Sequence, residues 1–217
     1  MLNVGLTGGI ACGKSTVAGM FVEKGAYLID FDRLAHQVQE KGKPAWQKIV
    51  DYFGKVILAQ DGTIDRVKLG NIVFADKNKL AELNKIVHPF VYGEWDARLE
   101  KIKRKDAHAI VLADIPLLFE GNKQHLFDLT MLVLIDPEEQ INRLIKRNKI
   151  SRDEAEKRLK SQMPIQEKKA LADIVIENRG SISETRKIVE ETWHHLLKLE
   201  KQKNQLILKH KNGGKND

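Results

Sequence analysis

Residues 8–15 read GGIACGKS, the most informative stretch of this chain. They fit the phosphate-loop pattern G-x-x-x-x-G-K-[ST], in which backbone N–H groups wrap a polyanion at the start of a helix. An apolar run at 2–7 precedes the loop, and helical periodicity follows it from Lys14 to Lys24. The sequence therefore predicts a strand, a phosphate loop and a helix, the opening of a parallel sheet.

The loop predicts a site for ATP with Mg²⁺. Glycines at its two ends allow a tight turn and a close approach of the backbone. We expect Lys14 to reach the β- and γ-phosphates and the Ser15 hydroxyl to ligate Mg²⁺. A glycine turn beside a surface lysine is the alternative, and the flanking strand and helix argue against it. The predicted loop contacts with ATP are Gly8, Gly9, Ala11, Cys12, Gly13, Lys14, Ser15 and Thr16.

The remaining pattern alternates between strands and helices. The apolar segments 26–29, 109–113, 130–135 and 173–176 are predicted strands. Residues 33–105 are mostly helical and too long for one crossover, so we interpret them as an inserted substrate-binding domain. Within this span, His88-Pro89 is expected to kink or end a helix.

Helix-start signals organise the second half of the chain. Asp136-Pro137 predicts a helix start, and Ser151 with Glu154 predicts a capping box. A closing amphipathic helix is expected from Ser181 to about Gln205.

These patterns define an α/β fold class, a P-loop NTPase-type parallel sheet flanked by helices, with a helical substrate-binding insertion and a lid. The predicted parts are a nucleotide-binding core (1–32, 106–137 and 170–200), the helical domain (33–105), a lid region (138–169) and a flexible basic tail (201–217).

The sequence lacks the marks of the main alternatives to a kinase. A guanine-nucleotide switch needs Asn-Lys-x-Asp, and neither Asn84-Lys85 nor Asn148-Lys149 continues in that way. A motor or helicase usually has Asp-Glu after a buried strand, whereas this strand ends in Ala113-Asp114-Ile115-Pro116. A small-molecule kinase is favoured, because carboxylates and arginines in this order are what phosphoryl transfer needs.

Two carboxylates and two arginines are the candidate catalytic groups. Asp30 and Asp32 follow the second strand, where parallel strands face a ligand crevice. We favour a functional Asp32, while Asp30 is equally well explained as a helix cap. Arg143 and Arg147 share one helix face and could clamp a phosphoryl group, or could form a solvated basic face.

Composition limits the partners. The net charge is +7, but the last twenty residues hold six lysines against Glu200 and Asp217, which indicates a polar tail rather than a nucleic-acid surface. No apolar run is long enough to span a membrane, and no signal peptide is evident. A single cysteine excludes an internal disulfide. We expect a cytoplasmic protein that binds neither membrane nor nucleic acid.

The ordered motifs resemble those of the dephospho-coenzyme A kinase family from residue 1 to about 200. The matching segments are LTGGIACGKSTV (6–17), IDFDRLAHQV (29–38), His88-Pro89, IPLLFE (115–120), QINRLIKR (140–147), RLKSQMP (158–164) and ADIVIEN (172–178).

The resemblance implies transfer of the ATP γ-phosphate to the ribose 3′-hydroxyl of dephospho-coenzyme A, the last step of coenzyme A synthesis. It implies that Asp32 is the general base and a substrate contact, that Arg143 and Arg147 are lid residues that bind phosphate, and that Asn178 lies near adenine. His88 is then either a substrate contact or a structural helix breaker. Asp114 is either a carboxylate near Mg²⁺ or a strand-end residue.

One departure concerns the loop itself. The family loop commonly reads Gly-Ile-Gly-Ser-Gly-Lys, and here Ala11 and Cys12 stand in the middle. Ala11 is expected to cost little if its φ is negative. Cys12 is either an inert small residue or, beside a helix start and Lys14, a thiol of lowered pKa that is readily modified unless ATP protects it.

Two other functions stay open at this point. One is a nucleotide-gated binding module that uses the basic tail on RNA or a membrane. The other is an adenylate-type kinase for a different nucleoside or nucleotide, because those enzymes share the loop and the lid.

Overall fold

A five-stranded sheet forms the centre of the fold, in the order β2-β3-β1-β4-β5. The computed structural model describes residues 1–213, with side chains to Leu206. β1 pairs in parallel with β3 on one side and β4 on the other, and β4 pairs in parallel with β5. The α/β fold class and its sheet are therefore confirmed. The strands are β1 (Leu2–Gly8), β2 (Tyr27–Asp30), β3 (Ile110–Asp114), β4 (Leu129–Leu134) and β5 (Ile174–Glu177).

Nine α-helices and two short 3-10 helices complete the part of the chain that the structure describes. They are α1 (Lys14–Glu23), α2 (Phe31–Val38), α3 (Pro44–Phe53), η1 (Lys55–Ile57), α4 (Arg66–Ala75), α5 (Lys77–Lys105), η2 (Gln124–Leu126), α6 (Pro137–Asn148), α7 (Arg152–Lys160), α8 (Ile165–Leu171) and α9 (Ile182–Gly213).

The chain divides into two compact units. One comprises Met1–Ile29 and Ile102–Asp217 and holds most of the sheet, and the other comprises Asp30–Lys101 and is helical. The division falls within a few residues of the limits expected for the helical insertion. Its role in substrate binding stays a prediction.

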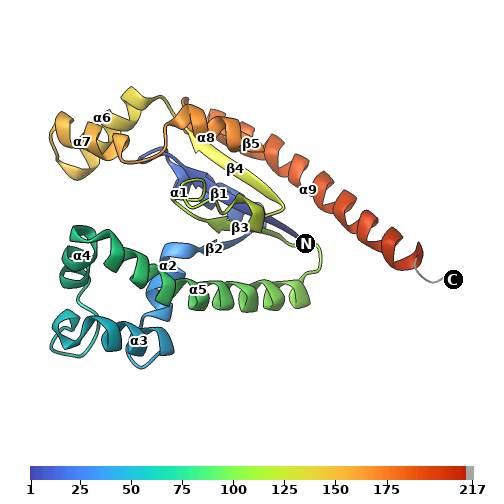
Figure 1. Cartoon of the computed structure of the whole chain (residues 1–217). Helices are drawn as coiled ribbons and strands as arrows, with labels where there is room; N and C mark the ends of the chain where they lie inside the picture. The colour runs from blue at the N-terminus through green and yellow to red at the C-terminus, as the bar shows by residue number, and fades with distance from the viewer. Residues whose placement is uncertain (214–217) are drawn as a thin grey trace. The chain divides into compact units, whose positions relative to one another are not determined.

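The core of the first unit lies between the sheet and two helices. All seven residues of β1 are buried, as expected for a central parallel strand. Val17 and Phe21 of α1 and Val189 and Leu196 of α9 are buried against the same cluster. Figure 1 shows α9 running along the sheet beside α1. Each large apolar side chain buried in this way contributes about 1.5–3 kcal/mol.

The predicted helix starts are largely confirmed. The Ser151 hydroxyl accepts a bond from the Glu154 N–H, and the Glu154 carboxylate accepts one from the Ser151 N–H, which completes the capping box. Asp136 is the N-cap of α6, but its side chain makes no capping bond and lies 3.4 Å from Arg179.

Of the two outcomes expected at His88-Pro89, a kink or an end of the helix, the structure excludes the end, because α5 continues through Pro89. Its axis changes direction along its length in Figure 1. A proline removes one hydrogen bond and bends a helix. Burial of Val87, Val91 and Trp95 on one face keeps the helix intact.

The expectation of a flexible tail from residue 201 is also wrong for the residues that the structure describes, because α9 extends to Gly213. Residues 214–217 lie outside the description. Side-chain bonds explain part of the extension. Lys203 donates to Asp128, and the Asn204 amide lies 3.0 Å from Nδ1 of His108.

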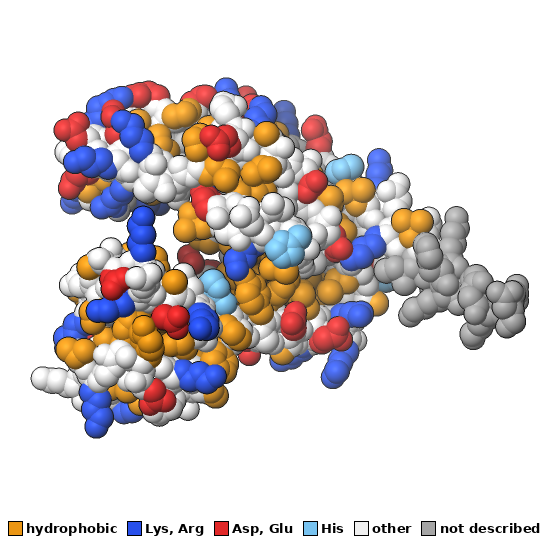
Figure 2. All heavy atoms as spheres, viewed as in Figure 1, with side chains coloured by type: hydrophobic (Ala, Val, Ile, Leu, Met, Phe, Trp, Pro, Cys, Tyr) orange, Lys and Arg blue, Asp and Glu red, His pale blue; other side chains and the backbone are white. Residues whose placement is uncertain are grey.

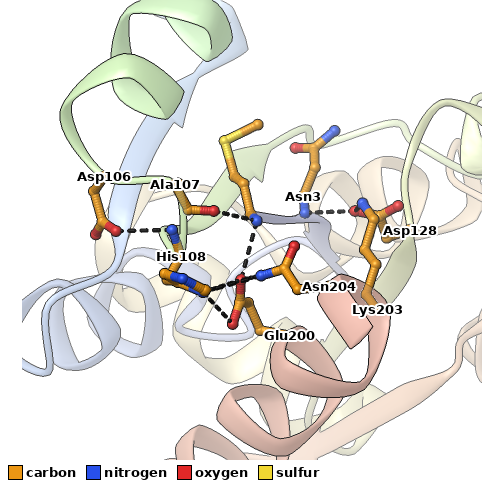
Figure 3. A network of polar contacts seen from close by, with 9 residues as sticks. Asn3, Asp106, Ala107, His108, Asp128, Glu200, Lys203 and Asn204 are labelled. Carbon is orange, nitrogen blue, oxygen red and sulfur yellow. Dashed lines mark hydrogen bonds and ion pairs between the residues drawn. The ribbon is translucent and has the colours of Figure 1, made fainter. Parts of the chain in front are cut away.

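A polar network joins α9 to the start of β1 (Figure 3). The Met1 ammonium group donates to Oε1 of Glu200 at 3.0 Å and to the carbonyl of Ala107 at 2.6 Å. Nδ1 of His108 lies 3.2 Å from the same Glu200 oxygen. Because Glu200 is 3% exposed, its carboxylate is stabilised by these partners rather than by water.

We predict that Glu200→Ala lowers the free energy of unfolding by about 2 kcal/mol, because it removes the buried carboxylate that accepts a charge-assisted hydrogen bond from the partly buried Met1 ammonium group. Urea denaturation measures this. Lys201→Ala is the matched control, because Lys201 is exposed next to Glu200 and should change stability little. Equal stability of the two variants would contradict a structural role for the network.

Candidate functional site

The phosphate loop, residues 8–15, connects β1 to α1 as predicted. Two of its residues have left-handed backbone angles, Ala11 with φ of 59° and Gly13 with φ of 85°. The Gly13 carbonyl accepts bonds from the N–H groups of Thr16 and Val17. Because α1 begins at Lys14, the N–H groups of its first turn point out of the helix end, where they can bind an anion.

The condition under which Ala11 was expected to cost little is not met, because its φ is positive. A Cβ in the left-handed region costs about 1–2 kcal/mol, and glycine escapes that cost. The family pattern places glycine here. The loop of this chain is therefore strained at Ala11, and contacts from other parts of the chain must stabilise its conformation.

We predict that Ala11→Gly raises the free energy of unfolding by about 1 kcal/mol. The measurement is urea denaturation followed by circular dichroism. The same change at an ordinary helical position, Ala97→Gly on the exposed face of α5, should instead lower stability by about 1 kcal/mol. Destabilisation by both variants would show that Ala11 is not strained.

The structure favours the inert alternative for Cys12. Its side chain is 2% exposed, and its Sγ fills the space where a side chain on Gly8 would lie. Burial raises the pKa of the Cys12 thiol, and this outweighs the opposite effects of the Lys14 N–H and the Lys14 charge. The expectation of a lowered pKa is therefore wrong, because desolvation exceeds the attraction of the helix start.

We predict that Cys12 in the folded protein reacts with iodoacetamide at least about 100-fold more slowly than in urea, both with and without ATP. A raised folded-state pKa contributes stability that is present below the ordinary value of 9.0 and is lost as the pH rises above it. Labelling at the rate of the unfolded chain would contradict burial. Mass spectrometry reads a single site, because Cys12 is the one cysteine.

Three amide side chains from outside the loop hold its backbone. Nε2 of Gln140 donates to the Ile10 carbonyl at 2.7 Å, and Oε1 of Gln162 accepts from the Ile10 N–H at 3.0 Å. Nδ2 of Asn178 donates to the Cys12 carbonyl at 2.8 Å, and Oδ1 of Asn178 accepts from the Thr185 hydroxyl at 2.7 Å. These bonds supply the support that a strained loop needs.

The same side chains explain two of the glycines. The amide of Gln140 occupies the place where a Cβ on Gly9 would lie, and the amide of Asn178 occupies that place at Gly13. Any side chain at Gly9 or Gly13 would displace its clamp. Sequence reasoning missed Gln140 and Gln162, although both lie within the quoted family motifs, because an amide residue type alone does not indicate its partner.

A buried ion pair anchors the segment that carries Gln162. Lys168 of α8 is 0% exposed, and its Nζ lies 2.7 Å from Oε1 of Glu120, without the angles of a hydrogen bond. The same Glu120 oxygen accepts from the N–H of Met163 at 3.1 Å. The helix α8 itself was not predicted. The pair and this bond fix the chain directly after Gln162, and therefore support the clamp on Ile10.

Lys14 and Asp114 meet at the loop. Lys14 donates to Oδ1 of Asp114, the last residue of β3. β1 and β3 are neighbours in register, so their ends bring the two side chains together. Ser15 lies next to Lys14 in the first turn of α1 and is exposed. This arrangement supplies an ammonium group for phosphate and oxygen atoms of the kind that Mg²⁺ prefers.

The predicted arginines lie on α6, and they differ in position. Nη1 of Arg143 lies 3.7 Å from where a Cβ on Gly13 would stand, and its Nε donates to Glu139 at 2.8 Å. Arg143 therefore points to the phosphate loop. Arg147 is exposed one turn later and donates to Asn148. The structure brings Arg143, and not Arg147, close to the loop.

Other charged groups join α6 and α7, the helices of the region predicted as a lid. Arg152 of α7 makes a two-pronged ion pair with Glu138 of α6, with both distances 2.8 Å. Acidic and basic side chains alternate over these two helices in Figure 2. A surface of paired charges therefore explains the arginines of these two helices as well as a role in binding phosphate does.

The predicted residues Asp30, Asp32 and His88 belong to the helical unit. Asp30 is the N-cap of α2, and its carboxylate accepts from the Arg33 N–H at 2.9 Å, which accounts for it as a cap. Asp32 lies in the first turn of α2, is exposed and does not cap the helix. The His88 ring packs against Tyr92.

The described residues contain neither a metal-binding cluster nor a membrane-spanning helix. They include no group of three or more His, Cys, Asp or Glu side chains placed to hold a metal ion. Within the same part of the chain, no helix is long and apolar enough to cross a membrane.

The parallel sheet carries a clamped phosphate loop, with Lys14 at the end of the loop and Arg143 beside Gly13. This arrangement defines a nucleotide-binding phosphotransferase of the P-loop kinase class. Comparison with known proteins is more specific. A family model for dephospho-CoA kinase matches residues 2–184. The chain belongs to the dephospho-CoA kinase family, whose members phosphorylate dephospho-CoA with ATP in the last step of coenzyme A biosynthesis.

Individual relatives agree with the family model. A dephospho-CoA kinase of Syntrophus aciditrophicus is 53% identical over 201 residues, which are 93% of this chain and 86% of the relative. One of Carboxydothermus hydrogenoformans is 50% identical over 84% of this chain and 88% of its own. The solved dephospho-CoA kinase from Campylobacter jejuni is 28% identical, with a TM-score of 0.69 over 90% of this chain and 97% of its own.

Proposed function

We propose that this protein transfers the γ-phosphoryl group of ATP to the ribose 3′-hydroxyl of dephospho-CoA, with Asp32 as general base and the phosphate loop as the ATP site. The observation that carries this proposal is the loop itself, with Lys14 at its end and Arg143 beside Gly13. Phosphoryl transfer needs positioning and electrostatic stabilisation more than covalent chemistry.

The loop residues bind the polyphosphate. The backbone N–H groups at the start of α1 and the Lys14 ammonium group hold the β- and γ-phosphates. The Arg143 guanidinium group neutralises charge that spreads over the transferring group. Arg147 and Asn178 are proposed to contact the remainder of ATP. The clamp of Asn178 on Cys12 supports a place for Asn178 beside the nucleotide.

Mg²⁺, when bound together with ATP, would offset negative charge on the phosphates. The Ser15 hydroxyl and the Asp114 carboxylate are suitable ligands, because both are oxygen donors close to Lys14. Their separate elements, α1 and β3, hold them independently of the metal.

Asp32 is the proposed acceptor of the hydroxyl proton. It lies just after β2, in the first turn of α2, and does not cap that helix. Its carboxylate is therefore available to accept a proton from the substrate. His88 is a second proposed substrate contact in the helical unit. We also propose a cytoplasmic location, with ATP and dephospho-CoA rather than nucleic acid as partners.

The closest competing function is phosphorylation of another nucleoside or nucleotide. A coupled ADP-release assay with Mg-ATP separates the two, with dephospho-CoA, AMP, adenosine or no acceptor. We expect release that depends on dephospho-CoA, with coenzyme A as the product. Release with AMP alone would replace the proposed acceptor. The absence of any acceptor-dependent release would favour the nucleotide-gated binding module instead.

We predict that Asp32→Asn lowers kcat by roughly 100-fold or more, because a general base is lost, while ATP still binds. Asp30→Asn is the matched control, because it changes the same group two residues away. It should affect the α2 cap and leave kcat near the original value. A near-normal kcat for Asp32→Asn would remove Asp32 from the mechanism.

A further inference from the structure

A cavity of about 390 Å³ lies beside the phosphate loop, within the unit that contains the sheet. It reaches Gly9 of the loop on one side and the 161–165 connection between α7 and α8 on the other. Apolar side chains form much of its wall, contributed by Pro137, Leu159, Met163, Pro164 and Ile165. The roles proposed above for ATP binding do not use these side chains.

One wall residue carries a buried polar atom that lacks a partner. Gln140 is 1% exposed, and its Nε2 is occupied by the Ile10 carbonyl. Its Oε1 has no hydrogen-bond partner among the described residues. Buried acceptors are nearly always satisfied, so this one calls for a donor. The oxygen is covered in this structure, so a ligand N–H or O–H group in the cavity meets it only after the groups that cover it shift.

The wall chemistry selects the kind of ligand. Phosphate groups need several cations or clustered N–H groups, whereas these walls are largely apolar and Lys160 is the one cationic residue among those that line the cavity. A flexible uncharged chain with methylene and amide groups fits better, because its methylenes bury against Met163 and Ile165 while an amide N–H meets Gln140. The pantetheine arm of dephospho-CoA has this chemistry and ends in a thiol.

A second cavity serves as a contrast. It has about 510 Å³, lies wholly in the helical unit, and includes Glu40, Lys43, Glu94 and Arg98 among its lining residues. Its charged lining suits an ionic group and would oppose an uncharged arm.

We propose that the cavity beside Gly9 binds the pantetheine arm of dephospho-CoA, with Oε1 of Gln140 accepting a hydrogen bond from the arm. The inference rests on the proposed function and adds a subsite to it. The connection between α7 and α8 then recognises the part of the acceptor that AMP and adenosine lack. The same connection holds the phosphate loop through the bond between Gln162 and Ile10. The α7–α8 connection therefore contacts both the proposed arm and the phosphate loop.

Disulfide capture tests the place of the arm directly. Met163→Cys and Ile165→Cys put a thiol in the wall, and Leu171→Cys puts one on the exposed side of α8 as the matched control. The introduced thiolate attacks the disulfide of oxidised dephospho-CoA, which forms a mixed disulfide and releases one dephospho-CoA thiol. Cys12 is buried and should not compete.

Rates are divided by those with 2-hydroxyethyl disulfide, which has no nucleotide and corrects for intrinsic thiol reactivity. We expect at least one wall variant to react about tenfold or more faster than Leu171→Cys after this correction, because binding raises the effective concentration of the arm. Equal corrected rates for all three variants would overturn the proposal. Because capture measures binding alone, the wild-type acceptor assay reports separately on the proposed function.

Filling the cavity is the second test. Met163→Trp should raise KM for dephospho-CoA by about tenfold, equivalent to about 1.4 kcal/mol, and leave KM for ATP unchanged. Leu171→Trp makes a comparable change outside the cavity and should alter neither constant. Thermal melting checks that both variants fold, and Ile165→Trp replaces Met163→Trp if the latter does not. An unchanged KM for dephospho-CoA in a folded wall variant would contradict the subsite.

Discussion

The bonds from Gln140 and Gln162 to Ile10 are the constraint on which the site depends. They fix both polar groups of one loop residue, the carbonyl through Gln140 and the N–H through Gln162. A loop that contains Ala11 at positive φ would relax without such support. The geometry that aims N–H groups at phosphate is therefore produced outside the loop as much as within it.

The clamps also connect parts of the chain that are distant in sequence. Gln140 comes from α6, Gln162 from the connection that Glu120 and Lys168 anchor, and Asn178 from the turn after β5. Each of these elements borders the proposed ATP or acceptor site. A displacement of α6 or α7 would reach the phosphate loop through hydrogen bonds with identifiable atoms, which gives a physical route for coupling between the lid region and phosphate binding.

The sequence predicted well what local chemistry determines. The phosphate-loop pattern, the capping box at Ser151 and the apolar strands are short-range signals, and all are present in the fold. The left-handed backbone of Ala11 could not be predicted from alanine itself, which does not normally adopt it, and the one signal for it was the glycine that the resembling family has at this position. The burial of Cys12 depends on packing beside Gly8, which outweighs the nearby charge of Lys14. The helix through Pro89 is likewise decided by tertiary packing of its buried face.

The helix α9 has a consequence for the tolerance of the chain to insertions. Thr185, near its start, bonds the Asn178 clamp at the phosphate loop, and Glu200 pairs with Met1 at the opposite end of β1. The helical rise between Thr185 and Glu200 is about 22 Å, and seven residues of strand span about 23 Å, so helix and strand are matched in length. One residue added or removed between these contacts would turn Glu200 by about 100° around the helix axis. That segment of α9 can therefore vary in side chain but not in length.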